Sequence, residues 1–359
     1  MTAILSNDFV KGLRSNVPLA FMVGVLIPTV IFLVMQLINN PDLFLQTFMK
    51  SLGLGSTYAL IALGFVLIFK ATQTVNFAQG SLAVAGALFL SFAVADGHIP
   101  LTTIENPLLR IGGPSWIPWF LSVGLALSFA ALLGLVIERL AIRPMIGQPL
   151  FSVAVITLGL ETMLRTFNND TSETELRSLR VPWGVQGFKI GDAFINWSYV
   201  AGIVAATVAF IAVYFFYRSR LGIAMRAVSL DQEAAMAQGI NVGRVFAIAW
   251  AAGAVLATLG GIMGSQPPVK QTGSIDPTSA NIAFRALPAV ILGGLDSAVG
   301  ALLGGLLIGS TEIFAGQYAA GLASTIGPGY PLVIPYVVML IGLVIRPYGM
   351  FGTPEIRRV

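Results

Sequence analysis

Long apolar stretches separated by short polar ones dominate the chain. A membrane-spanning helix needs about 20 apolar residues, with a range of about 17–25. By that length the sequence predicts about ten hydrophobic segments: 19–38, 45–69, 76–95, 116–138, 150–167, 197–217, 245–264, 280–294, 297–317 and 331–346. The segment 280–294 is short and contains Arg285 and Pro288, so we expect one or two segments to be short, broken or re-entrant. The pattern predicts an all-α fold, a polytopic membrane helix bundle.

The composition also indicates a membrane protein. Hydrophobic residues make up 56% of the chain and charged residues 10%, with a mean hydropathy of +0.85. Soluble domains carry about 25% charged residues, so a soluble fold of this size would lack the groups to cover its surface. We therefore interpret residues 1–359 as a single transmembrane domain. Gly305 and Gly309 match the G-x-x-x-G pattern of a helix-packing face.

The basic residues predict the orientation of the chain. Lys11 and Arg14 precede the first apolar run, which is longer than the 7–15 residues of a signal-peptide core. We interpret 1–44 as holding a retained, extra N-terminal span that begins inside the cell. Alternation of the spans then places most loop lysines and arginines inside, so both termini are expected to be cytoplasmic in a multi-pass protein of the inner (plasma) membrane. The net charge of +4 comes mainly from these loops and is a topology signal, not a nucleic-acid footprint.

Residues for catalysis or metal binding are scarce. The chain has no cysteine and a single histidine, His98, without an HExxH pattern, so we expect no metal site and no enzymatic activity. It also contains no G-x-x-x-x-G-K-[ST] phosphate-binding loop. No cofactor is therefore expected in this chain, and if ATP drives its function, ATP and Mg belong to partner subunits.

The longest polar island lies at 218–244 and carries four arginines and two acidic residues. It contains the run Glu233-Ala234-Ala235-x-x-x-Gly239. One interpretation is an ordinary solvated connector between two spans. The other is a cytoplasmic docking helix, because alanines favour helix, Gly239 lets the chain turn out of it, and Glu233 offers one charge.

A second polar motif, Val75–Gly80, interrupts two apolar runs. Its amide side chains Asn76 and Gln79 flank Phe77 and precede Gly80. An unpaired amide is costly in lipid, so both amides should face protein or water. The motif fits either a buried hydrogen-bond network that fixes helix packing or a broken helix that lines a transport pathway, with Asn76, Phe77, Gln79 and Gly80 as the candidates for the lining.

Four ionisable residues fall within the apolar segments: Glu161, Arg165, Arg285 and Glu312. A charge at the centre of a lipid-exposed helix costs a few kcal/mol or more (~3). Glu161 and Arg165 are four residues apart, in the favourable acid-first order, so mutual neutralisation is expected. Arg285 and Glu312 lie in neighbouring segments, and the sequence leaves their pairing open; they are the candidates for ion coupling if the protein is a secondary transporter.

A family resemblance connects these features. The run EAAMAQG at 233–239 resembles the cytoplasmic EAA motif of ABC importer permeases, and the stretches 53–87, 286–309 and 345–359 resemble their branched-chain amino acid branch. The resemblance covers most of the chain from about residue 45 onward.

What the resemblance implies is a permease domain, the transmembrane subunit of an ATP-driven importer for branched-chain or other hydrophobic amino acids. The implied partners are two ABC ATPase subunits, a second related permease, an extracytoplasmic substrate-binding protein and membrane lipid. In that setting 218–244 docks the ATPase, with contacts from Glu233, Ala234, Ala235 and Gly239. Urea or short amides are alternative substrates, and an ion-coupled secondary transporter is a further alternative.

Overall fold

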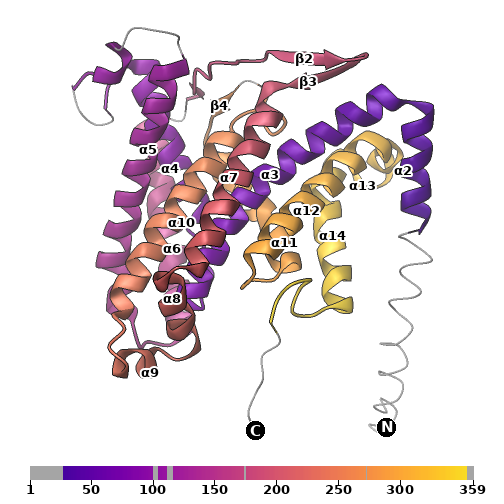
Figure 1. The fold of residues 1–359 in the computed structure, drawn as a ribbon. Coiled ribbons are helices and arrows are strands. Elements are labelled where there is room, and N and C mark those ends of the chain that lie inside the picture. The colour runs from indigo at the N-terminus through magenta and orange to yellow at the C-terminus, as the bar shows by residue number, and fades with distance from the viewer. Residues whose placement is uncertain (1–26, 100–103, 111–115, 174, 272, 354–359) are drawn as a thin grey trace, which may run out of the picture.

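The computed structural model describes residues 27–99, 104–110, 116–173, 175–271 and 273–353, and within them the chain is mostly helical (Figure 1). Every predicted hydrophobic segment coincides with a helix. These helices are α2 (Ile27–Asn39), α3 (Pro41–Thr72), α4 (Gln79–Ser91), α5 (Trp116–Ile137), α6 (Leu150–Ser172), α7 (Trp197–Arg218), α10 (Val242–Gly264), α11 (Ile282–Gly293), α12 (Ala298–Tyr318) and α14 (Tyr330–Ile345). Residues 19–26 of the first predicted segment lie outside the described residues, as do Lys11 and Arg14.

Six helices in the described part of the chain are long and apolar enough to cross a membrane. They are α3, α4 with the π-helical turn Phe92–Asp96, α5 with its extension to Met145, α7, α10 and α12. The predicted number of about ten spans is therefore not confirmed. The 12-residue α11, for example, is about 18 Å long at 1.5 Å per residue, whereas the hydrocarbon core is about 30 Å thick.

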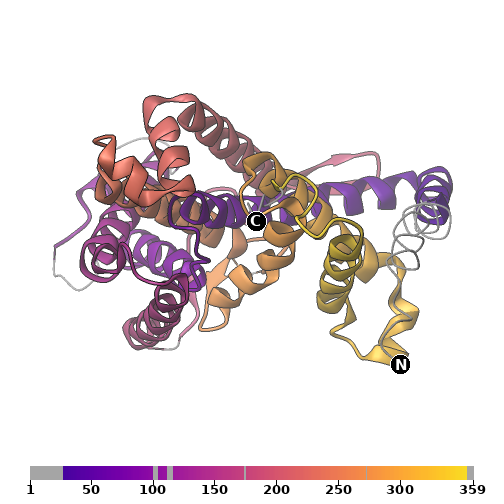
Figure 2. The ribbon, with the colours of Figure 1, turned by 90° about the horizontal axis from the view of Figure 1, so that it is seen from below.

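The long helix α3 forms the centre of the bundle, and all its residues from Gly53 to Ile68 are buried. It packs against α12, α10, α7 and α11. Its contact with α12 is close, because a Cβ atom added at Gly305 would lie 2.5 Å from the Ala59 nitrogen. The predicted G-x-x-x-G face is thus a packing face. Figure 2 shows α4, α5 and α6 on one side of the molecule and α12, α14 and α2 on the other.

The connections carry short elements that the all-α prediction did not include. At one end of the bundle β1 (Arg177–Ser178) pairs antiparallel with β4 (Ser274–Ile275), and β2 (Gly187–Ile190) pairs with β3 (Ala193–Asn196). The opposite end carries α8 (Arg220–Leu230) and α9 (Gln232–Ala237) (Figure 1). The remaining helical turns are Pro107–Arg110, Glu138–Ile142, Arg143–Met145, Ser279–Asn281, Ala320–Leu322 and α13 (Ala323–Ile326).

The start of α4 lies next to the segment that leads into α11, inside the bundle. Helix α3 ends at Gln73, which adopts the left-handed conformation with φ 56°, and the chain then turns back toward α10. A Cβ atom added at Gly80 would lie 2.2 Å from the Ala280 carbonyl oxygen, so the first turn of α4 packs directly on the segment that leads into α11. Irregular backbone of this kind is tolerated in a membrane protein only where protein buries it or where it lines a cavity.

Candidate functional site

The two amide side chains of the Val75–Gly80 motif form a buried network. Asn76 Nδ2 donates to Gln79 Oε1 at 3.0 Å, and Asn76 Oδ1 accepts from the Ala78 backbone N–H at 3.1 Å. Gln79 Nε2 donates to the Gly253 carbonyl oxygen, midway along α10, at 3.3 Å. Both side chains are fully enclosed. This geometry matches the first interpretation of the motif, a hydrogen-bond network that fixes helix packing.

Phe77 is partly exposed, as is Val75, while Asn76, Gln79 and Gly80 are buried. The Phe77 backbone N–H donates to Thr157 Oγ1 at 3.2 Å. Thr157 belongs to α6 and was not identified from the sequence. The available signal was its position one turn before Glu161.

The predicted pair Glu161–Arg165 is confirmed. Arg165 Nε and Nη2 both donate to Glu161 Oε1, at 2.9 and 2.6 Å. Arg165 Nη1 donates to Asn281 Oδ1 at 3.3 Å, which joins α6 to the entrance of α11. Asn281 is a contact that sequence reasoning missed, because the two residues are far apart in the chain.

Further polar contacts continue along the same face of α6. The Ser81 hydroxyl donates to the Glu161 carbonyl oxygen at 3.4 Å, and Asn168 Nδ2 donates to the Ser81 carbonyl oxygen at 2.9 Å. Thr157, Glu161, Arg165 and Asn168 are spaced by three or four residues and so share one helix face. This polar face of α6 is directed at the first turns of α4 and α11.

The pairing of Arg285 with Glu312, left open by the sequence, is present in the structure. Arg285 Nη2 is bonded to Glu312 Oε1, and Tyr58 Oη donates to Glu312 Oε2 at 2.6 Å. The triad ties α3, α11 and α12 together. Both oxygens of the carboxylate are thereby occupied, and Glu312 is buried.

The EAA run forms helix α9, which is capped at both ends. Asp231 Oδ1 accepts from the Ala234 N–H at 2.9 Å at its start. At its end Gly239 has φ +80°, its N–H donates to the Met236 carbonyl at 2.9 Å, and the Ile240 N–H donates to the Ala235 carbonyl at 3.0 Å. This is a Schellman termination, which requires the left-handed conformation that glycine adopts without strain.

The predicted docking residues fall on two sides of α9. Glu233, Ala234 and Gly239 are exposed, whereas Ala235 is 4% exposed and packs into the hydrophobic core of this chain. Ala235 therefore seats the helix on its own bundle and leaves the contact surface to its neighbours. Met236 and Leu230, both exposed, add apolar area beside Ala234.

A chain of contacts connects the α8–α9 region to the bundle. Arg226 Nη1 donates to the Tyr217 carbonyl at 2.9 Å. The Lys70 ammonium lies 4.8 Å from the centre of the Tyr217 ring and donates to the Asp296 carbonyl at 2.9 Å. These contacts join α8 to the end of α3, immediately before the Val75–Gly80 motif, and to the turn between α11 and α12.

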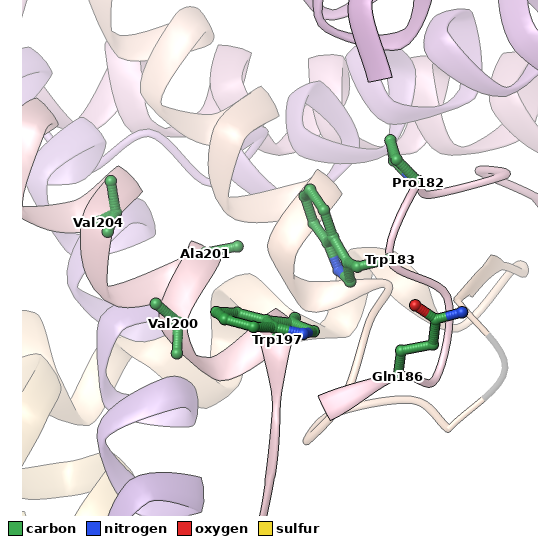
Figure 3. Close-up of a pocket in the computed structure, with 7 residues that line it drawn as sticks. All are labelled: Pro182, Trp183, Gln186, Trp197, Val200, Ala201 and Val204. Atoms are coloured by element: carbon green, nitrogen blue, oxygen red, sulfur yellow. The ribbon is translucent and has the colours of Figure 1, made fainter. Parts of the chain in front are cut away.

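A separate groove lies beside β2 and β3 and has a volume of about 430 Å³. Figure 3 shows the indoles of Trp183 and Trp197 and the amide of Gln186 around it; its lining also includes Pro182, Val200, Ala201 and Val204. The Trp183 N–H is engaged with Ser198 Oγ and Gln266 Oε1, at 3.0 and 3.1 Å. The groove thus offers mainly apolar contact. Among the residues described, no group of three His, Cys, Asp or Glu side chains could hold a metal ion.

In the described part of the chain, six helices are long and apolar enough to cross a membrane, and the first turn of α4 packs on the segment that leads into α11. These features are those of a multi-pass membrane protein. The chain belongs to the branched-chain amino acid transport system permease component family, whose model matches residues 47–344.

Individual relatives extend the match. The chain is 29% identical over 328 residues to the high-affinity branched-chain amino acid transport system permease protein BraD of Pseudomonas aeruginosa, which covers 88% of this chain and 98% of BraD. It is also 29% identical over 324 residues to the permease protein LivH of Escherichia coli, with 88% and 98% covered.

Proposed function

We propose that this chain is the transmembrane subunit of an ATP-driven importer that translocates branched-chain or other hydrophobic amino acids. The observation that carries the proposal is the family match over residues 47–344, together with relatives that are permeases of branched-chain amino acid transport systems. An extracytoplasmic binding protein delivers the substrate, and a second related permease completes the pathway. ATP and Mg act on two ABC ATPase subunits outside this chain.

In this account α9 is the ATPase-docking helix. Glu233, Ala234 and Met236 offer an exposed surface, and the caps at Asp231 and Gly239 hold the helix rigid. An exposed salt bridge contributes only about 0–1 kcal/mol, so a contact of Glu233 is too weak to provide the coupling alone. Rigid seating through Ala235 matters more.

The contacts through Tyr217 and Lys70 give a route by which α9 acts on the pathway. A displacement of α8 pulls on the end of α3, and the Val75–Gly80 motif follows directly. ATP shifts the permease between inward- and outward-open states only if the docking contacts differ between the two states. Phe77 lines the pathway, and Asn76, Gln79 and Gly80 hold the backbone that presents it.

The membrane orientation follows from the same assignment. Arg218, Arg220, Arg226 and Arg244 lie in or beside the α8–α9 region, so the positive-inside rule places this end and both termini in the cytoplasm. The strands β1–β4 then lie on the side that receives the binding protein. The ion-coupled alternative needs free ionisable groups, and the engagement of Arg285 and Glu312 with each other favours the ATP-driven mechanism instead.

Co-purification tests this assignment. The wild-type chain, purified from its native membrane, should bring down a nucleotide-binding subunit, and Ala234→Trp should abolish that while the chain remains in the membrane. Ala212→Trp, the same change at an exposed position on α7, is the matched control and should retain the ATPase. Full ATPase recovery with Ala234→Trp would refute the docking assignment, and substrate uptake by the chain alone in ion-loaded vesicles would refute the importer class.

A further inference from the structure

The ion pair between Glu161 and Arg165 on α6 uses only one of the two carboxylate oxygens. A carboxylate and a guanidinium usually form two parallel hydrogen bonds, one to each oxygen. Here Arg165 Nε and Nη2 both bind Glu161 Oε1, at 2.9 and 2.6 Å. Glu161 is only 7% exposed, and its Oε2 is buried without a hydrogen-bond partner in the described part of the chain. A buried charged oxygen without a partner is costly, so the site has an unused acceptor for a cationic group.

Arg165, in turn, has hydrogen-bond donors that no contact among the described residues uses. A guanidinium has five N–H donors, and three of them are used, one each on Nε, Nη2 and Nη1. The Arg165 side chain is 34% exposed. Its two remaining N–H groups can therefore bind an anionic group that approaches from the open side of α6.

The position of the pair places it beside the broken helices. Arg165 contacts Asn281 at the entrance of α11, and Ser81 in the first turn of α4 bonds to the Glu161 backbone. Phe284, one turn after Asn281 on α11, is exposed and adds an apolar surface.

We infer that Glu161 and Arg165 form a subsite for the zwitterionic backbone of an α-amino acid; this inference rests on the proposed function. The ligand carboxylate binds the two remaining N–H groups of Arg165, and its ammonium binds Glu161 Oε2, the carboxylate oxygen that Arg165 does not contact. Phe284 contacts the apolar side chain of the ligand. One ion pair becomes two, and no net charge is transferred into the membrane, which keeps the electrostatic cost low.

This subsite distinguishes zwitterionic amino acids from compounds that carry one charge or none. Urea and short amides carry neither charge and gain nothing from the two groups. A carboxylate or an amine alone satisfies one partner and leaves the other unpaired. The subsite therefore favours amino acids over the neutral alternatives after the binding protein has released its substrate.

The test measures binding of radiolabelled leucine to the complete permease–ATPase complex in nanodiscs, without binding protein. Glu161→Gln and Arg165→Gln should each weaken leucine binding by about 10-fold to 100-fold, the value of one charge-assisted hydrogen bond. Arg165→Lys should recover part of the loss, because it keeps the charge. Thr162→Val, at an exposed position of α6 whose hydroxyl bonds to the Leu158 carbonyl of the same helix, is the control and should leave leucine binding unchanged.

Competition on the wild-type complex gives a second readout that does not depend on the folding of a variant. Unlabelled leucine should displace the label far better than 4-methylpentanoate, isopentylamine or 4-methylpentanamide. Equal competition by the neutral amide, unchanged binding in both glutamine variants, or no leucine binding by a complex that transports leucine would each overturn the subsite. A complex that neither binds nor transports any amino acid would instead overturn the proposed function.

Discussion

The triad of Tyr58, Arg285 and Glu312 allows a prediction whose size follows from the structure. Arg285→Met removes the cation bonded to Glu312, whose side chain is 8% exposed, and leaves Tyr58 as its partner among the described residues. Breaking a buried ion pair in this way costs about 3–5 kcal/mol. The Arg285 side chain is 28% exposed, so the lower end, about 3 kcal/mol, applies.

Thermal unfolding of the purified chain in detergent measures this loss. At about 2 °C per kcal/mol for a large domain, Arg285→Met should lower Tm by about 6 °C. The double variant Arg285→Met/Glu312→Gln should return to within about 1 kcal/mol of wild type, because the glutamine still accepts from Tyr58 and carries no charge. Arg220→Met, at an exposed position, should change Tm little. If the double variant is as unstable as the sum of its two single changes, the triad is not a charge-compensated unit and the reasoning is wrong.

Three further predictions follow from the buried junction and the loop before α11. Gly80→Val should destabilise the chain by about 1–3 kcal/mol, because the carbonyl oxygen 2.2 Å from the added Cβ cannot move freely; a Tm equal to wild type would contradict this close packing. Gln79→Leu should lower the transport rate even where Tm stays close to that of wild type. A transport rate equal to that of wild type would exclude a role of this network in presenting Phe77. Burial raises the pKa of Asp276, but its hydrogen bonds and its ion pair with Lys270, at 2.5 Å, outweigh this effect and hold the pKa below its ordinary value. The stabilisation from Asp276 is present above the unfolded-state pKa of about 3.9 and is lost as pH falls through the lower folded-state pKa. Asp276→Asn should therefore remove this acid-dependent part of Tm.

Within the described residues, each predicted hydrophobic segment coincides with a helix, because each of these helices is a continuous apolar stretch. The pairing of Glu161 with Arg165 was equally predictable, since four residues bring two side chains together on a helix. Arg285 and Glu312 are 27 residues apart, so their contact depends on how α11 packs against α12, which local spacing does not encode.

The parts that could not be predicted are those that depend on tertiary packing. Gln79 bonds to Gly253, which is 174 residues away, and Gly80 packs on Ala280 through backbone atoms alone. The inward orientation of Ala235 was equally hidden, because α9 is too short for a clear apolar period. The strands β1 and β4 have two residues each, which is too little for an alternating pattern.

Substrate-stimulated ATP hydrolysis tests the central claim most directly. The chain is reconstituted with its ATPase subunits, partner permease and binding protein, and hydrolysis is measured with leucine, isoleucine, valine, urea and short amides. The account predicts stimulation and ATP-dependent uptake with the branched-chain amino acids and none with urea or amides. Stimulation by urea or an amide alone, or leucine uptake that continues without ATP on an ion gradient, would contradict it.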